Sequence, residues 1–289
     1  MQFHREQHLL RRVEHSGQGW HAVLDIDSVN RRVKVKSYRF DHRDGLAALG
    51  EHLLSLAREE GCGKVLAEVR EGEWEQFLGR GFTLEGLIPG YFAGEPAYCL
   101  SYFVDPKRQA SSRLERDNAI REQVLSLDPV HDRVLDPRFT IHVPSPDDAD
   151  EMANLYRKVF TTYPTPLNDA AFIRDVMVRE ASIFRLVRDG GRLVSAASAE
   201  VDWVSLHAEM TDCATLPDYR GEGLMAALLK ELEQEMVKRG IHCRYSHARA
   251  ASPGMNAVLR RLGYRLRGRM VNNCHIMGSF EDMNLWVKI

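Results

Sequence analysis

The order of predicted elements occurs twice along the chain, and this repeat constrains the fold more than any other feature. In the first half a helical pattern at 41–61 leads into the alternating run KVLAEV, a short helix and the segment FLGRGFTLEG. In the second half a helical pattern at 223–240 leads into IHCRYSHAR and then NAVLRRLGYRLRG. Each half therefore reads helix, strand, helix, glycine–aromatic pair and strand. The repeat predicts two domains of the same architecture, with two unrelated α/β halves as the alternative.

A polar segment separates the two halves. With 289 residues, the chain is long enough for two domains that each bury a core. Residues 104–137 are polar, with prolines near both ends, and are predicted to include a helix from about Ser112 to Leu127. We place the boundary near Asp136, which gives one domain at 1–135, linker helix included, and a second at 136–289. We expect an α/β (α+β) fold in which each domain is a mixed, mostly antiparallel sheet flanked by helices.

The second half has the clearer local signals. A strand at 139–143 precedes a helix with Ser145 as its cap, and the acidic first turn of this helix suits the positive end of the helix dipole. A second helix is predicted from about Asn168 to Arg179. Three strands follow, roughly IFRLVRD, RLVSAASAEVDW and SLHAEMTDCAT, and DGG forms the turn between the first two.

Composition argues against several classes of protein. The chain carries 39 basic and 41 acidic residues mixed along the sequence, so no large field indicates nucleic acid or a membrane as a partner. Its five cysteines form no Cys-x-x-Cys pair, which argues against a disulfide framework or a structural zinc site. No run approaches about 18 apolar residues, and the charged N-terminal stretch does not resemble a signal peptide. We expect a cytoplasmic protein that binds no metal.

Two glycines stand directly before a long amphipathic run in the segment LPDYRGEGLMAALLKELEQEM, residues 216–236. Glycine is a poor helix former, so Gly221 and Gly223 indicate that another group approaches the backbone there. A strand that ends in such a turn and feeds a helix presents unpaired N–H groups, backed by the helix dipole, to an anion. Arg220 is a candidate for an additional phosphate contact or for bracing the loop. An ordinary tight turn is the alternative, and the common nucleotide motifs are absent.

This segment resembles the acetyl-coenzyme A loop of the GNAT acyltransferases, whose pattern is Arg/Gln-x-x-Gly-x-Gly/Ala. The likeness covers residues 138–289. It implies that the pyrophosphate of acetyl-CoA lies on the loop N–H groups and that the pantetheine pairs with the preceding strand. The cofactor-binding residues implied are Cys213, Ala214, Thr215, Arg220, Gly221, Glu222, Gly223, Leu224, Met225 and Asn256. Met225 departs from the pattern because glycine or alanine is usual there, and Asn256 has helix N-cap as its alternative role.

Three further segments resemble one particular group within the GNAT acyltransferases. They are GLIPGYFAGEPAYCLSYFVDPKRQ at 86–109, ARAASPGMN at 248–256 and NNCHIMGSFEDMNLWVKI at 272–289. Together they look like the β-lysine N-acetyltransferases, and this likeness covers nearly the full chain. It implies acetylation of the side-chain amine of β-lysine to give the compatible solute Nε-acetyl-β-lysine, by direct transfer in a ternary complex.

The reaction requires a base because an alkylammonium has a pKa near 10.4, so freeing its lone pair at pH 7 costs roughly 4 to 5 kcal/mol. Glu209 lies on the strand before the loop, where relatives that acetylate lysine carry a general-base glutamate; a solvent-facing glutamate is the alternative. Asp212 is the second candidate. For the proton that the leaving thiolate needs, the family's usual tyrosine position is Leu259 here, and we take Tyr245 as the catalytic candidate. Ser246 and His247 are alternatives to it.

Selection of β-lysine requires a cation for the carboxylate and an acid or amide for the second amine. The predicted substrate-binding residues are Arg249, Asn272, Asn273 and Asp212. The first domain lacks the glycine pattern before its helix, so we expect it not to bind acetyl-CoA and to act as scaffold or as one wall of the substrate channel.

The sequence thus predicts an acetyl-CoA-dependent N-acetyltransferase with a small-molecule amine as substrate, no nucleic-acid or membrane partner, and a homodimer as the assembly to test. Three alternatives remain. The first two are acetylation of another small amine and acetylation of a protein lysine. The third is a non-catalytic acyl-CoA sensor.

Overall fold

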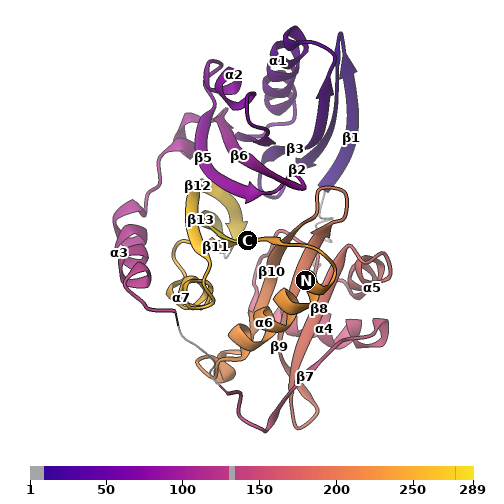
Figure 1. The fold of residues 1–289 in the computed structure, drawn as a ribbon, viewed down its shortest axis with the longest axis vertical. Coiled ribbons are helices and arrows are strands. Elements are labelled where there is room, and N and C mark those ends of the chain that lie inside the picture. The colour runs from indigo at the N-terminus through magenta and orange to yellow at the C-terminus, as the bar shows by residue number, and fades with distance from the viewer. Residues whose placement is uncertain (1–9, 130–133, 277) are drawn as a thin grey trace, which may run out of the picture.

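The structure, a computed structural model, describes residues 10–129, 134–276 and 278–289. Within them, strands from both halves of the chain form one sheet in the order β1-β2-β3-β4-β6-β5-β12-β13-β11-β10-β9-β8-β7 (Figure 1). The N-terminal half contains β1 (Leu10–Gly17), β2 (Trp20–Asp27), β3 (Arg32–Phe40), α1 (Arg43–Glu59), β4 (Lys64–Val69), α2 (Trp74–Leu78), β5 (Thr83–Gly90), β6 (Gly94–Phe103), η1 (Pro106–Gln109) and α3 (Leu114–Leu125).

The C-terminal half repeats this order after four additional elements. It contains β7 (Phe139–His142), η2 (Pro146–Asp148), α4 (Ala149–Val159), α5 (Ala170–Val178), β8 (Ser182–Asp189), β9 (Arg192–Asp202), β10 (His207–Thr215), η3 (Pro217–Tyr219), α6 (Leu224–Lys238), β11 (Cys243–Arg249), α7 (Pro253–Arg261), β12 (Arg265–Ile276) and β13 (Ser279–Lys288). The order β1-β2-β3-β4-β6-β5 matches β8-β9-β10-β11-β13-β12. In each half the third and fourth of these strands are parallel, and the other strand pairs are antiparallel. The architectural repeat predicted from the sequence is therefore present.

The two halves share one sheet, whereas the sequence analysis expected a separate sheet in each domain. The junction is the antiparallel pairing of β5 with β12 at Gly86 and Gly268. A Cβ on Gly268 would lie 2.2 Å from the carbonyl oxygen of Glu85 and 2.5 Å from the Cα of Gly86. These two strands are equivalent in the repeat, so glycine at their crossing allows the two backbones to approach closely.

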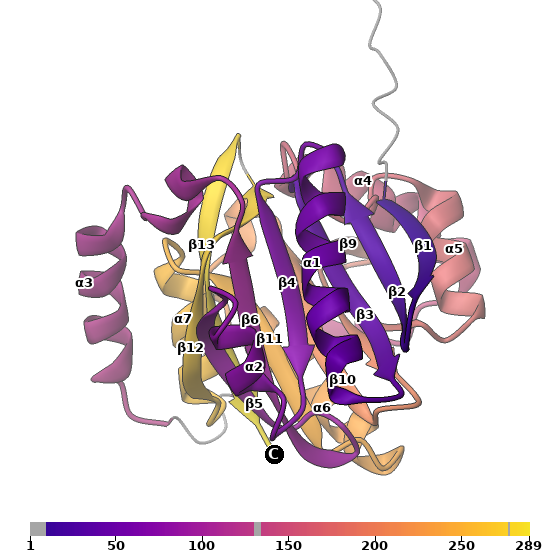
Figure 2. The same cartoon turned by 90° about the horizontal axis from the view of Figure 1, so that it is seen from above.

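Two hydrophobic cores and a shared cluster hold the fold together. In the N-terminal half, α1 packs on one face of β2, β3 and β4 (Figure 2). In the C-terminal half, helices α4, α5, α6 and α7 pack with the sheet in a second core. A third cluster joins the halves, with Leu66, Ile88 and Tyr91 from one half against Tyr245 and Leu285 from the other.

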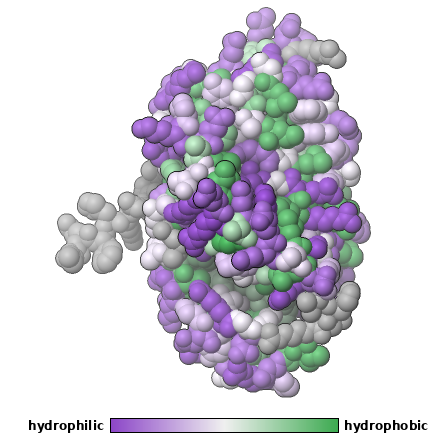
Figure 3. All heavy atoms as spheres, turned by 90° about the vertical axis from the view of Figure 1, so that its left-hand side faces the viewer, coloured by the Kyte–Doolittle hydropathy of each residue, from purple (hydrophilic) through white to green (hydrophobic). Residues whose placement is uncertain are grey.

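The alternation of β3 determines what the N-terminal half presents to the C-terminal half. Val33 and Val35 are buried against α1, so Lys34 and Lys36 lie on the opposite face of the strand. The helix that links the halves, α3, lies on a largely hydrophilic face of the molecule (Figure 3). Within the described residues, no helix is both long and apolar enough to span a membrane.

The predicted local elements agree well with the structure. The linker helix, predicted from Ser112 to Leu127, is α3, and the second helix of the C-terminal half, predicted from Asn168, is α5. Ser145 forms a capping box with Asp148 at the short helix η2, directly before α4. The DGG turn has Gly190 and Gly191 at positive φ between β8 and β9.

Candidate active site

Strands β10 and β11 pair over three residues only. Their parallel ladder runs from His207–Cys243 to Glu209–Tyr245, while β10 remains paired with β9 as far as Thr215. Beyond Glu209 the edge of β10 that faces β11 therefore has no strand partner among the described residues. Such an edge offers main-chain N–H and C=O groups to an extended ligand.

A β-bulge lies in β10 at the end of the paired region. The register with β9 shifts between Thr211 and Ala214, and Asp212 has a φ of 54°. A bulge bends its strand and redirects side chains, so it separates the section of β10 that carries Glu209 from the section that carries Cys213 to Thr215. Among these, Ala214 is fully buried, and the Thr215 hydroxyl lies 2.8 Å from that of Ser195.

The glycine loop opens α6 as the sequence predicts. Gly221 and Gly223 have φ values of 87° and 85°, and Gly223 is the N-cap residue. A Cβ on Gly221 would meet no atom within 4 Å, so the space beside it is open. Within the described part of the chain, the N–H groups from Glu222 to Met225 donate to no protein acceptor.

The side chains of the loop do not cover these N–H groups. Arg220 is exposed, the Glu222 carboxylate lies 3.4 Å from Arg138, and Leu224 and Met225 pack against the C-terminal core. A helix N-terminus with free N–H groups and open space favours a bound anion. These residues fit the diphosphate of acetyl-CoA.

Glu209 and His247 form a pair at the point where the strands diverge. The Nδ1 atom of His247 lies 3.0 Å from Oε1 of Glu209. Burial acts to raise the pKa of Glu209, but His247, Lys34 and Lys36 together outweigh burial and lower this pKa to about 2. Glu209 is therefore ionised at neutral pH, and its charge faces the N-terminal half.

Asp212 has the opposite electrostatic character although it is three residues away. It is 4% exposed, its Oδ2 accepts a hydrogen bond of 2.6 Å from Ser198, and its Oδ1 has no partner among the described residues. Burial raises the pKa of Asp212 to about 7, against the effect of hydrogen bonds from Ser198 and Tyr163. This carboxyl group changes its charge near neutral pH.

Tyr245 lies in the contact between the two halves. Its ring centroid lies 5.8 Å from that of Tyr91, 5.7 Å from that of His207 and 5.6 Å from that of His247. Burial raises the pKa of Tyr245 well above its ordinary value, so the phenol keeps its proton at neutral pH. The structure places this phenol next to the Glu209–His247 pair.

Asn256 is not positioned as either of its predicted roles requires. Its side-chain nitrogen donates to the carbonyl groups of Arg249 and Ser252, and its Oδ1 accepts from Asn284 and Trp286. It is fully buried within α7, and the N-cap of this helix is Ser252. With its amide committed to these four bonds, Asn256 joins α7 to β11 and β13.

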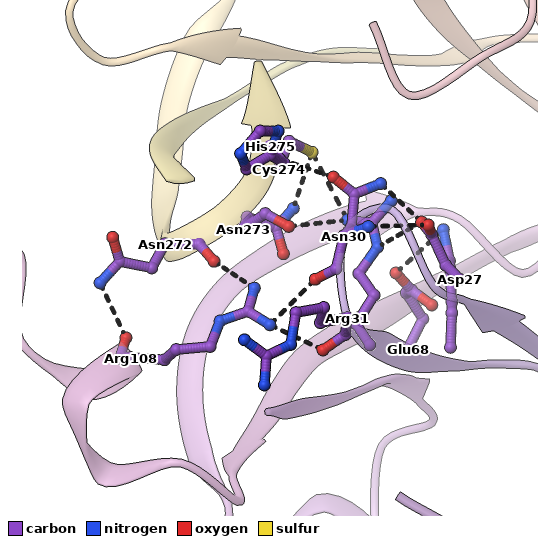
Figure 4. Close-up of polar contacts among 11 residues, drawn as sticks. Asp27, Asn30, Arg31, Glu68, Arg108, Asn272, Asn273, Cys274 and His275 are labelled. Carbon is purple, nitrogen blue, oxygen red and sulfur yellow. Dashed lines mark hydrogen bonds and ion pairs between the residues drawn. The ribbon is translucent and has the colours of Figure 1, made fainter. Parts of the chain in front are cut away.

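Asn272 and Asn273 lie in a network between the halves (Figure 4). The side chain of Asn272 donates to the carbonyl groups of Arg108 and Ala110, and Arg108 donates back to the carbonyl group of Asn272. Asn273 is buried, and its carbonyl group accepts from Arg32. The Asn272 amide, committed to these backbone groups, has a structural role instead of the predicted substrate contact. The described contacts of Asn273 likewise lie in this network.

Arg249, the remaining predicted substrate residue, is half-buried at the end of β11. It is two residues from His247, so its side chain lies on the same face of the strand as His247. This face is the one that Tyr245 shares with the N-terminal half.

The N-terminus of α1 corresponds in the repeat to the N-terminus of α6, but it is covered by another part of the chain. A Cβ on Gly45 would lie 2.2 Å from the carbonyl oxygen of Gly19, and the same oxygen accepts a hydrogen bond from the N–H of Asp41. The turn between β1 and β2 thus covers this helix N-terminus. The N-terminal half has no anion site here equivalent to the glycine loop.

Sequence reasoning missed four charged residues near Glu209. Lys34 and Lys36 of β3, Glu68 of β4 and Glu200 of β9 act electrostatically on Glu209 or on one another. The spacing of the two lysines in RVKVK is a period-two signal for one strand face. The local sequence does not indicate which partner that face meets.

Comparison with known proteins relates the chain to acetyltransferases. Residues 149–264 match the Acetyltransferase (GNAT) family. The chain is 36% identical over 282 residues to the N-acetyltransferase YodP of Bacillus subtilis, across 97% of this chain and 99% of that protein. It is 31% identical over 268 residues to the Beta-lysine N(6)-acetyltransferase of Methanococcus maripaludis, across 93% and 96%. The crystal structure of the ribosomal-protein-S18-alanine N-acetyltransferase from Escherichia coli matches 52% of this chain and 92% of that one, with 20% identity and a TM-score of 0.44.

Proposed function

Because the chain belongs to the GNAT acetyltransferase family and is an N-acetyltransferase, we propose that it transfers the acetyl group of acetyl-CoA to the side-chain amine of β-lysine. The observation that carries this proposal is the juxtaposition of three features: the open glycine loop, the edge of β10 that has no strand partner among the described residues, and the pair of Glu209 on β10 with His247 on β11. The substrate is supported by the relative named Beta-lysine N(6)-acetyltransferase, which the chain matches over 93% of its own length.

Acetyl-CoA supplies an activated thioester, and the chain holds it at two places. The N–H groups at the start of α6 bind the diphosphate, since those from Glu222 to Met225 donate to no acceptor among the described residues and are backed by the helix dipole. The edge of β10 from Cys213 to Thr215 pairs with the pantetheine, whose amides provide both donors and acceptors. This arrangement directs the thioester toward Glu209, where the two strands diverge.

The Glu209–His247 pair removes the proton from the substrate ammonium. The ionised carboxylate attracts the ammonium, and the pair accepts its proton directly or through one water. The free amine then attacks the thioester carbonyl, a C–N bond forms, and the C–S bond breaks as the thiolate leaves. No acyl-enzyme is formed, because both substrates occupy the site together.

The leaving thiolate takes a proton from a neighbouring group, and we assign this role to the Tyr245 phenol. The second proton that the nitrogen loses as the amide forms restores this phenol. Burial keeps this phenol protonated at neutral pH, and its ring adjoins His247. The product, Nε-acetyl-β-lysine, has lost one positive charge and is a zwitterion without net charge, which suits a solute that accumulates in the cytoplasm.

The test is release of free thiol from acetyl-CoA in the presence of β-lysine, lysine, 1,5-diaminopentane and a lysine peptide, with the acetylated product identified by mass spectrometry. We expect the largest kcat/KM with β-lysine. Glu209→Gln should lower kcat by about 10²- to 10⁴-fold while acetyl-CoA still binds. Turnover of the peptide alone would reject a small-amine substrate, and binding of acetyl-CoA without turnover of any amine would support a sensor instead.

A further inference from the structure

The repeat places a second charged pair opposite the Glu209–His247 pair. In the parallel ladder of the C-terminal half Glu209 is aligned with Tyr245, and in the ladder of the N-terminal half Lys34 is aligned with Leu66. His247 lies two residues beyond Tyr245, and Glu68 lies two residues beyond Leu66. Lys34 and Glu68 therefore occupy the positions in β3 and β4 that Glu209 and His247 occupy in β10 and β11.

This second pair is formed and faces the first. The Nζ atom of Lys34 lies 3.6 Å from Oε1 of Glu68. Tyr91, on the loop between β5 and β6, stacks on His207 of β10 with ring centroids 3.7 Å apart, and its carbonyl oxygen lies 2.9 Å from Nδ1 of His207. The sheet of the N-terminal half is thus held directly against the start of β10, with the face of Lys34 toward Glu209.

Two charges on these facing surfaces lack an ion-pair partner within the described chain. Lys36 is the extra residue where the register of β3 with β2 shifts, and it is exposed. Glu200 is directly across the β9–β10 ladder from Glu209 and is also exposed. By contrast, Asp25 and Lys34 each have an ion-pair partner. The Nε atom of Arg12 lies 2.7 Å from Oδ1 of Asp25, and Lys34 pairs with Glu68.

The charges that act on Glu200 come from both halves of the chain. Its carboxyl group reaches solvent, yet burial by surrounding protein raises its pKa, as does Glu209, while Lys36 and Lys34 act in the opposite direction. The facing surfaces of β3 and β9 thus bring Lys36 of one half into the electrostatic environment of Glu200 of the other. A ligand there meets one unpaired cation and one unpaired anion.

We propose that the N-terminal half recognises the amino-acid end of the substrate, with Lys36 binding its carboxylate and Glu200 of the C-terminal half binding its second ammonium. Lys34, paired with Glu68, supplies an additional cation that acts electrostatically on both Glu200 and Glu209. The inference rests on the proposed function, since it assumes that the reacting amine is at Glu209. An amino acid with two amines carries two positive charges and one negative charge, and Glu209, Glu200 and Lys36 complement these in sign.

The experiment compares β-lysine with two amines that each lack one of its charges. 1,5-Diaminopentane has no carboxylate and one more carbon between its two amines than β-lysine, and 6-aminohexanoate lacks only the second ammonium. Lys36→Met should raise KM for β-lysine and 6-aminohexanoate on the order of 10- to 100-fold, the value of one hydrogen bond to a charged group, with kcat nearly unchanged. It should leave KM for 1,5-diaminopentane unchanged. Lys36→Glu should lower KM for 1,5-diaminopentane.

Glu200→Gln should raise KM for β-lysine and 1,5-diaminopentane but not for 6-aminohexanoate. Lys107→Met is the matched control, because it removes one positive charge from an exposed position on η1, and it should change none of these values. The inference is overturned if Lys36→Met raises KM equally for all three amines, or if the unaltered enzyme uses the diamine as well as β-lysine. Failure of the proposed function looks different, since no amine of the panel would then be acetylated by the unaltered enzyme.

Discussion

Two carboxyl groups of β10, three residues apart, show how the position of a residue determines its chemistry. Glu209 lies beside one imidazole and two lysines, which hold its pKa at about 2. Asp212 is at the bulge, where burial dominates and its pKa rises to about 7. The sequence HAEMTDCAT contains both residues in a similar local setting, so only the three-dimensional environment distinguishes them.

The raised pKa of Asp212 predicts a pH-dependent stability. The folded state holds the proton more tightly than the unfolded state, in which an aspartate has a pKa near 3.9. The stability that this proton contributes is complete below that value and is lost as the pH rises through about 7. Asp212→Asn should therefore gain about 2 to 4 kcal/mol relative to the unaltered protein between pH 4 and pH 8.

Urea unfolding at a series of pH values measures this difference. Asp218→Asn is the control, because Asp218 is exposed on η3 in the same segment of the chain and should show no such trend. A difference between Asp212→Asn and the unaltered protein that stays constant across the pH range would contradict the assignment.

At the scale of elements, the glycine loop leads directly into α6, with Gly223 as the N-cap residue. The two glycines at positive φ form the turn that leads into α6, and an added Cβ at Gly221 would meet no atom within 4 Å. The other end of the same helix also has a glycine at positive φ, Gly240, where an added Cβ would meet no atom within 4 Å. A Cβ added at either end would therefore meet the same left-handed backbone strain, but the two ends differ in dipole sign.

Comparing Gly221→Ala with Gly240→Ala separates strain from binding. Each should lose about 1 to 2 kcal/mol of stability, the cost of a Cβ in the left-handed region. Only Gly221→Ala should weaken acetyl-CoA binding, by about 10- to 100-fold, because its methyl group occupies the space that the diphosphate requires. Isothermal titration with acetyl-CoA checks this, and equal affinities for the two variants would argue against the loop as the diphosphate site.

At the scale of the whole molecule, the halves are joined by strand pairing as well as by a shared core. Lys64 is fully buried at the junction, with its Nζ 2.7 Å from Glu85 and 2.8 Å from the carbonyl oxygen of Val271. Lys64 of β4 therefore forms an ion pair with a residue of β5 and donates a hydrogen bond to the backbone of β12. The crossing of Gly86 and Gly268 allows these strands to meet.

Gly268→Ala should destabilise the entire protein, because its methyl group would meet backbone atoms at 2.2 and 2.5 Å. We expect a loss of about 1 to 3 kcal/mol, typical of overpacking, or more if the strands separate. Gly254→Ala is the control, since no atom lies within 4 Å of its Cβ position in α7 and alanine favours a helix. Thermal unfolding compares the two, and equal melting temperatures would refute the role of the crossing.

The sequence by itself determined the elements of this protein and the position of its glycine loop. Amphipathic periods identify α1 and α6, alternation identifies β4, and the glycines at 221 and 223 mark the start of α6, because each signal lies within one turn or strand. The tertiary structure decided which surfaces meet. The pairing of β5 with β12, the inward amide of Asn256 and the face of Lys34 and Lys36 toward Glu209 all join residues far apart in the chain. A local pattern specifies the face on which a side chain lies, but the partner of that face depends on how the whole chain packs.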